Sequence, residues 1–232
     1  ADLPLLACCL CTGMTDAACF ANWSTFVGMQ TGNTVILGLS ASSLPPRPYT
    51  WLSTLVSISS YLMGCYVTFR VARRFAPKDL YSNRLLFVSL FFIQSLLLFL
   101  SASLATVPGL IPQIPPSAPT HAAEDKRVLA SIEIVALIPP LAIESGFQIS
   151  CSRLLGFNEL PVNVLTSLYC DTVGDPNLFA LHNVKRNRRV AAIVLLLLGA
   201  IISGWLMRSA GGLASVLWLA GGIKIILAVA IL

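Results

Sequence analysis

Charged side chains are scarce in this chain of 232 residues, where Lys, Arg, Asp and Glu make up 11% and hydrophobic residues 56%. The mean hydropathy of +0.81 lies far above that of soluble domains. This composition excludes a soluble globular protein and predicts an integral membrane protein. Several runs of about 20 apolar residues leave no room for a separate soluble catalytic domain. We therefore expect one polytopic domain over residues 1–232, with the lipid bilayer as its main partner.

Motifs of common enzymes are also missing, because no Ser-His-Asp order, H-E-x-x-H pair or P-loop occurs. The run Cys8-Cys9-Leu10-Cys11 formally contains C-x-x-C, but no second pair and no neighbouring histidine accompany it. A zinc site therefore lacks ligands, and we expect the seven cysteines to act mainly as small apolar side chains. The sequence predicts a protein that is not an enzyme and that holds neither a metal nor a cofactor.

Long apolar runs predict about six transmembrane helices in an all-α integral membrane fold. They lie near residues 5–20, 50–69, 84–105, 127–148, 190–207 and 211–232. Two shorter segments that carry polar residues, 30–39 and 161–170, are interspersed among them, and each is too short to cross a bilayer. We expect them to be broken or re-entrant. Interrupted segments in corresponding positions of two halves point to the binding site of a transporter.

Lysine and arginine gather around two predicted loops, near residues 70–84 and 185–189. The positive-inside rule places both loops in the cytoplasm and the proline-rich loop, residues 106–127, outside. Topology and lipid headgroups explain the net charge of +5 better than a nucleic-acid partner does. The plasma membrane is the favoured location, and the oligomeric state is left open.

The predicted orientation makes the two halves of the chain, about 3–105 and 128–232, cross the membrane in opposite senses. Each half contains a polar-ended span, a short broken segment and two plain spans. Three full crossings in each half reverse the second copy relative to the first. We therefore predict two inverted repeats, an architecture that secondary transporters use.

Polar blocks in the first half resemble a known family. Residues 13–17, Gly-Met-Thr-Asp-Ala, are followed by residues 30–39, which begin Gln-Thr-Gly-Asn-Thr. Together they resemble the hallmark of YoaK-like membrane proteins, the family known as domain of unknown function 1275. The resemblance implies a polytopic protein of about six spans that is suspected of transport, without a settled substrate.

The second half carries diverged forms of the same elements. Gly146-Phe147-Gln148 looks like the G-x-Q element of the family, with Ile149 where an asparagine is usual. Residues 164–168 look like the second threonine–glycine element without its glycine. The continuation to Asp171 is similar to what fungal members carry, which indicates a eukaryotic source.

The two short segments supply candidate groups for binding a solute. Glycine frees the backbone at a helix break, and threonine and asparagine side chains replace hydrogen bonds that the break removes. The candidates are Gln30, Thr31, Gly32, Asn33, Thr34, Gln148, Asn163, Thr166 and Ser167. The alternative is that these groups only form hydrogen bonds between packed helices.

Ionisable side chains in or beside the predicted spans are further candidates: Asp16, Glu144, Arg153 and Lys224. Charges inside a membrane are costly and by default mark functional positions. Asp16 is the candidate for proton coupling or for pairing with a substrate cation. Lys224 or Arg153 is the candidate partner of an anion or of a carboxylate. A fixed ion pair that only holds helices together is the alternative.

The sequence thus predicts a secondary transporter or facilitator of a small polar or anionic metabolite, with its site between two inverted halves. A non-transporting membrane scaffold or accessory protein is the alternative. A membrane-embedded enzyme ranks third, because no nucleophile, base and orienting group converge in the sequence. A transporter should show a wet polar cavity at the breaks, whereas a scaffold should show polar groups that satisfy one another in a dry core.

Overall fold

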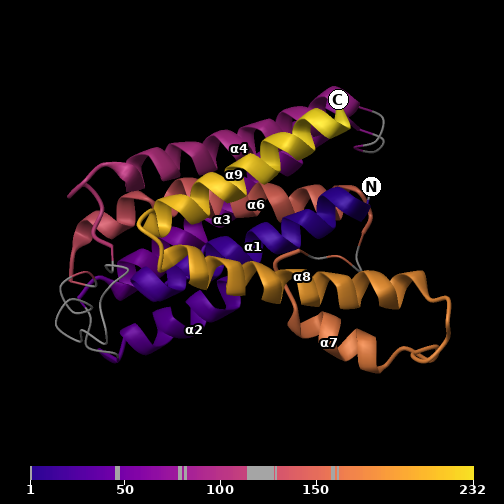
Figure 1. Ribbon diagram of the computed structural model, residues 1–232, viewed down its shortest axis with the longest axis horizontal. Helices are drawn as coiled ribbons and strands as arrows, with labels where there is room; N and C mark the ends of the chain where they lie inside the picture. Colours follow the sequence, from indigo (N-terminus) through magenta and orange to yellow (C-terminus); the bar gives the residue numbers. More distant parts are fainter. Residues whose placement is uncertain are drawn as a thin grey trace.

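Every regular element in the described part of the chain is a helix (Figure 1). The computed structural model describes residues 2–44, 48–77, 80, 83–113, 128, 130–157, 160 and 162–232. Six helical segments are long and apolar enough to cross a membrane, which confirms the predicted fold class. They are α1 (Asp2–Trp23), α3 (Thr50–Phe75), α4 (Arg84–Thr106), η2 (Ile132–Ala136) together with α6 (Ile138–Leu154), α8 (Val184–Met207) and α9 (Gly212–Ile231).

Two short helices interrupt this series, as the sequence predicts. The first, α2 (Gln30–Ser40), follows α1 after a turn at residues 24–29, where Ser24 has a φ of 54°. The second, α7 (Thr166–Val173), starts later than the predicted segment 161–170, and residue 161 lies outside the described residues. At about 1.5 Å per residue, neither helix could cross a bilayer.

The fourth span is displaced from its predicted range of 127–148. Pro139 and Pro140 occupy the first positions of α6, which continues to Leu154. Proline has no N–H group and disfavours helical geometry in the residue before it, so it fits the first turn of a helix and not its middle. Glu144, expected near the end of the span, consequently lies near its middle. The predicted proline-rich loop, 106–127, falls mostly outside the described residues.

Asparagines cap two other helices, of which α4 begins where its apolar run begins and α8 begins at Val184, before its predicted range of 190–207. Asn83 accepts a hydrogen bond from the backbone N–H of Leu86 at the start of α4, at 3.0 Å. Asn183 does the same for Arg186 at the start of α8, also at 3.0 Å. Such caps satisfy helix N–H groups that have no partner within the helix. The basic residues expected before the fifth span therefore lie within the first turns of α8.

Helices pack in pairs that join the two halves of the chain. In Figure 1, α4 lies beside α9, and α1 runs through the middle of the molecule. The most extensive contacts are α1 with α8, α3 with α6, and α4 with α9, and the short helices α2 and α7 rest on α3 and α8. Glycines allow two of these crossings, since a Cβ at Gly13 would lie 2.0 Å from the carbonyl oxygen of Leu196, and one at Gly146 would lie 2.4 Å from that of Tyr61.

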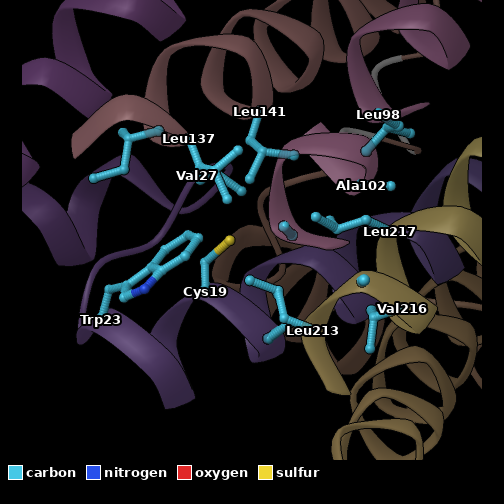
Figure 2. Close-up of a cluster of buried hydrophobic side chains, with 14 of the residues drawn as sticks. Cys19, Trp23, Val27, Leu98, Ala102, Leu137, Leu141, Leu213, Val216 and Leu217 are labelled. Carbon is cyan, nitrogen blue, oxygen red and sulfur yellow. The ribbon is translucent and has the colours of Figure 1, made fainter. Parts of the chain in front are cut away.

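Buried apolar side chains form two clusters at opposite ends of the bundle. Figure 2 shows part of the first, where Trp23 and Val27 meet Leu137 and Leu213 near the end of α1. The second cluster lies at the other end of α1, around Leu5 and its neighbours on α4, α6 and α9. The middle turns of the helices thus form a layer between two apolar regions.

Candidate functional site

Polar side chains occupy the layer between the two apolar clusters. Along each of the helices α1, α4, α6 and α9, the polar positions lie between residues of one apolar cluster and residues of the other. We call the set formed by Thr12, Gln94, Glu144, Gln148, Asn163 and Lys224 the central polar cluster. None of its members is more than 4% exposed. The cluster is therefore a buried polar layer within an otherwise apolar bundle.

Lys224 on α9 is the centre of this layer. Its ammonium group lies 2.9 Å from the Oε1 atom of Glu144 and donates a hydrogen bond of 2.6 Å to the Oε1 atom of Gln94. It also donates to the side-chain oxygen of Gln148. The Sγ atom of Cys8 lies 3.5 Å from the same nitrogen, so the three N–H donors of the ammonium group face four protein atoms. The ring of Phe91 lies 5.5 Å from the nitrogen, within the range of a cation–π contact.

Gln148 links the lysine to the second break. Its Nε2 atom donates to Thr12 Oγ1 at 2.6 Å and to Asn163 Oδ1 at 2.8 Å. Asn163 in turn donates to Ser145 Oγ at 2.8 Å. The residue before it, Val162, has a φ of 42°, which is a strained conformation for a β-branched residue. The chain thus turns sharply at the position where Asn163 enters the cluster.

The first break is held by a carboxylate and does not reach the lysine in the contacts described. Asp16 Oδ1 accepts hydrogen bonds from the backbone N–H groups of Val27 at 2.8 Å and Gly28 at 2.7 Å. Two such bonds stabilise the ionised form of a carboxylate. The contact gives Asp16 a structural role, because it fixes the turn between α1 and α2. Its role in proton coupling stays a prediction.

Asn33 and Gln30 join the same turn to α3. The amide of Asn33 pairs with the backbone of Phe26 in both directions, at 3.0 and 2.7 Å, and donates to Ser57 Oγ at 3.0 Å. Gln30 donates to Val27 O at 2.8 Å and to Ser57 Oγ at 3.2 Å. These contacts replace backbone hydrogen bonds that the break between α1 and α2 removes.

The two polar regions approach each other at Gly28. A Cβ added there would lie 2.8 Å from Ser145 Oγ and 3.0 Å from Asp16 Oδ2. Asp16, Ser145, Thr15 and Glu144 are each 4–6% exposed, whereas Lys224 is 0% exposed. The side chains where α1 faces α6 are therefore less completely enclosed than the lysine.

Several predicted site residues lie on the surface of the bundle. The exposed ones are Thr31, Thr34, Thr166, Ser167 and Arg153. Thr34 donates its hydroxyl hydrogen to the Gln30 carbonyl of its own helix at 2.9 Å. Gly32 is half-buried, and a Cβ there would lie 2.9 Å from the ring of Phe26. Of the predicted candidates, the structure brings together Glu144, Gln148, Asn163 and Lys224 in one cluster and Asp16, Gln30 and Asn33 at the first break.

Sequence reasoning missed four residues of these networks: Thr12, Gln94, Ser145 and Ser57. Gln94 had a usable signal, because it is an amide in the middle of the strongly apolar span Arg84–Thr106. The hydroxyl residues had none, since serine and threonine commonly bond to the carbonyl four residues earlier in their own helix.

Within the ranges described, no group of three or more His, Cys, Asp and Glu side chains could hold a metal ion. The groups present are one ammonium, two carboxylates, amides and hydroxyls. Groups of these types are able to bind ions or polar solutes by charge and hydrogen bonding.

A model of the family described as a protein of unknown function (DUF1275) matches residues 4–230, nearly the whole chain. The match confirms the resemblance seen in the polar blocks of the sequence. No curated protein and no solved structure matches the chain.

Proposed function

This chain belongs to the DUF1275 family, and we propose that it is a secondary transporter or facilitator of a small polar or anionic metabolite. Its solute site is the central polar cluster. The observation that carries this proposal is the buried pair of Lys224 and Glu144 in the middle of the bundle, surrounded by amides.

Stability alone is a weak reason for such a pair. Removing two charges from water costs several kcal/mol per ion, and well-packed apolar residues of similar volume often stabilise a core as well or better. Ionisable groups inside a membrane therefore point to ion or solute pathways by default. The cluster also draws on α1 and α4 from the first half and on α6 and α9 from the second, so it lies where the halves meet.

The helix pairs support the predicted inverted repeats. Exchanging α1 with α6, α2 with α7, α3 with α8 and α4 with α9 converts the α1–α8 pair into α6–α3. The same exchange converts α2–α3 into α7–α8 and leaves α4–α9 unchanged. Gly13 and Gly146, which allow the two close crossings, are equivalent under this exchange, as are Gly199 and Gly64.

This exchange also suggests which parts move. One body contains α1, α8 and α7, the other α6, α3 and α2, so each body has helices from both halves of the chain. The turn at residues 24–29 connects α1 of one body to α2 of the other, and the chain that follows Leu154 connects α6 to α7. Alternating access then consists of one body rocking against the other around the central polar cluster.

A specific observation favours the alternative, a membrane scaffold without transport. Most polar groups of the cluster pair with one another, and the donors of Lys224 all face protein oxygens or the sulfur of Cys8. A closed cluster is equally compatible with an occluded, solute-free state of a transporter. Flux measurements separate the two hypotheses.

The test is a screen with purified protein in liposomes. Pooled small anions and polar metabolites are assayed for uptake and efflux, with and without a proton gradient, against protein-free liposomes. The transport proposal requires protein-dependent flux that Asn163→Ala reduces and Asn187→Ala, an exposed asparagine on α8, does not. No flux from any pool with folded protein would overturn it in favour of the scaffold.

A further inference from the structure

We propose that Glu144 and a carboxylate of the substrate compete for the ammonium group of Lys224, so that one proton enters the site with each monovalent carboxylate. This inference rests on the proposed transport function and adds its substrate class, coupling ion and coupling residue.

A solute gains little from Lys224 while the three oxygens around it stay in place. Nζ faces Glu144 Oε1, Gln94 Oε1, the side-chain oxygen of Gln148 and, at 3.5 Å, the Sγ atom of Cys8, and an ammonium group has only three donors. An anion that binds the lysine must therefore displace one of these acceptors. Which acceptor leaves decides the charge balance of the site.

Glu144 is the acceptor held by the fewest other contacts. Gln148 also donates to Thr12 and Asn163, and Gln94 donates to the sulfur of Cys151 at 3.9 Å. By contrast, Glu144 Oε1 is buried and has no hydrogen-bond partner of normal geometry among the described residues, despite its 2.9 Å approach to the lysine. Moving Glu144 breaks one ion pair, whereas moving either glutamine breaks additional hydrogen bonds.

If the buried site is to stay electrically neutral when an anion binds, a proton must enter with the anion. The resting pair of ammonium and carboxylate has a net charge of zero. An anion that displaces an ionised Glu144 would leave two negative charges beside one positive charge in a buried site, which is strongly unfavourable. If Glu144 takes up one proton from water, its neutral carboxyl group can leave the lysine, and the substrate carboxylate replaces it with the net charge still zero. Release reverses both events, and no covalent bond to the solute forms or breaks.

A monovalent carboxylate is the chemistry that fits this exchange. The lysine already faces a carboxylate at 2.9 Å, so a substrate carboxylate can use the same contact. A dianion would bring a second charge that one glutamate cannot balance. A neutral solute would not displace the glutamate at all.

Other titratable groups around the pair do not take over the role of Glu144. Those that interact with the pair are Cys8, Cys11 and Asp16 on α1 and Cys151 on α6. Tyr61 and Cys65 lie on α3, which packs against α6. Thiols and phenols ordinarily titrate above pH 8. Asp16 is fixed by two backbone N–H groups, and α4 contributes Gln94 and Phe91, which do not titrate. Of the two carboxylates, Glu144 is the one that contacts the lysine.

The experiment measures initial uptake of radiolabelled lactate into liposomes that contain the purified protein, with rates corrected for protein-free liposomes. Lactate is the monocarboxylate probe, succinate the dianion and glycerol the neutral solute. A proton gradient and a potassium-diffusion potential are imposed separately. The expected result is saturable lactate uptake that an inward proton gradient accelerates and that the membrane potential leaves unchanged, with succinate and glycerol not transported.

Glu144→Gln supplies the sharpest comparison, because a permanently neutral side chain lets the anion bind without a proton. In this variant, lactate movement should lose its response to the proton gradient and become electrogenic. One charge across 100 mV then changes the equilibrium accumulation about 50-fold. Glu133→Gln, an exposed glutamate of the same span, is the control and should behave like the unaltered protein.

Three results would overturn the inference. The first is transport of other pooled solutes but not of lactate. The second is lactate uptake by the unaltered protein that responds to the membrane potential. The third is lactate uptake by the Glu144→Gln variant that still responds to the proton gradient. Each leaves the transport proposal standing, whereas the absence of flux for every pooled solute overturns transport itself. If the Glu144→Gln variant does not fold, the inference is tested by whether lactate uptake by the unaltered protein responds to the proton gradient and not to the membrane potential.

Discussion

Lys224 on α9 and Glu144 on α6 form a buried ion pair, with the lysine nitrogen 2.9 Å from a glutamate oxygen. The two residues lie 80 positions apart in the sequence (224 − 144). Their helices meet only in the folded bundle. Their pairing leaves the polar layer neutral. The stability and the proposed function of the protein both depend on this neutrality.

Breaking the pair on one side should destabilise the protein more than removing both charges. Lys224→Met or Glu144→Gln alone leaves a buried charge without its partner, a loss of about 3–5 kcal/mol for such pairs. The double variant should recover most of that loss. A double-mutant cycle of unfolding free energies in detergent measures the coupling.

Glu133→Gln serves as the control for the cycle, because it removes an exposed glutamate from the same span. It should change the unfolding free energy by about 0.5 kcal/mol or less. Additive losses in the two single variants would show that the pair is not coupled.

Gly28→Ala should destabilise the first break. The added Cβ would lie 2.8 Å from Ser145 Oγ and 3.0 Å from Asp16 Oδ2, so the neighbouring side chains must move. We expect a loss of about 1–3 kcal/mol, the usual cost of overpacking. Thermal unfolding in detergent checks the effect, and the additional change Ser145→Ala should restore part of the stability.

Gly38→Ala is the matched control, since nothing lies within 4 Å of a Cβ at that position of α2. It should be neutral or slightly stabilising, because alanine favours helix over glycine. A Gly28→Ala protein as stable as the Gly38→Ala protein would argue against the described contact between the break and α6.

Close crossing of α1 and α8 should depend on Gly13 and Gly199. A Cβ at Gly199 would lie 2.1 Å from the Leu10 carbonyl oxygen, and backbone atoms cannot move aside as a flexible side chain can. Gly199→Ala should therefore lower the thermal midpoint, while Gly204→Ala on the same helix should not, because it meets open space. Equal midpoints for the two variants would contradict the close approach of these helices.

Asp175, in the loop between α7 and α8, gives a pH effect outside the membrane spans. Backbone N–H donation from Asn177, followed by Asn183 and Arg189, lowers the pKa of its carboxyl group from the ordinary 3.8. Because the folded-state pKa is depressed, this stabilisation is present above pH 3.8 and is lost as the pH falls through the folded value. Nuclear magnetic resonance titration of the loop should show a midpoint below 3.8 that Arg189→Gln moves upward. A midpoint at or above the ordinary value would refute these contacts.

Apolar runs and polar interruptions predicted much of the fold. They identified six long helices and two short ones, because burial in lipid demands long apolar segments and a short segment cannot cross. They placed the fourth span about one and a half turns too early, since hydropathy ignores the effect of Pro139 and Pro140 on helix starts. The end of α3 at Phe75 and the start of α8 at Val184 were also missed, because basic residues continue a helix beyond its apolar run.

The candidate site was predictable only in part. Ionisable and amide residues inside apolar runs, such as Glu144, Gln148 and Lys224, could be recognised by their cost in lipid. Their convergence could not, because it depends on which helices become neighbours and on the rotation of each helix about its axis. Thr31, Thr34 and Ser167 share the composition of a polar break but lie on its exposed side, which sequence composition does not distinguish.

One measurement tests the central claim most directly: the flux, in liposomes, of a solute found in the pooled screen, compared between Lys224→Met and Lys185→Met. Both variants remove one lysine charge, but Lys224 lies in the central polar cluster and Lys185 is exposed in the first turn of α8. The double variant Lys224→Met with Glu144→Gln, also neutral, controls for loss of folding. We predict that both Lys224 variants lose the flux and that Lys185→Met retains it. Full flux in a folded Lys224→Met protein would contradict the assignment of the solute site to the central polar cluster.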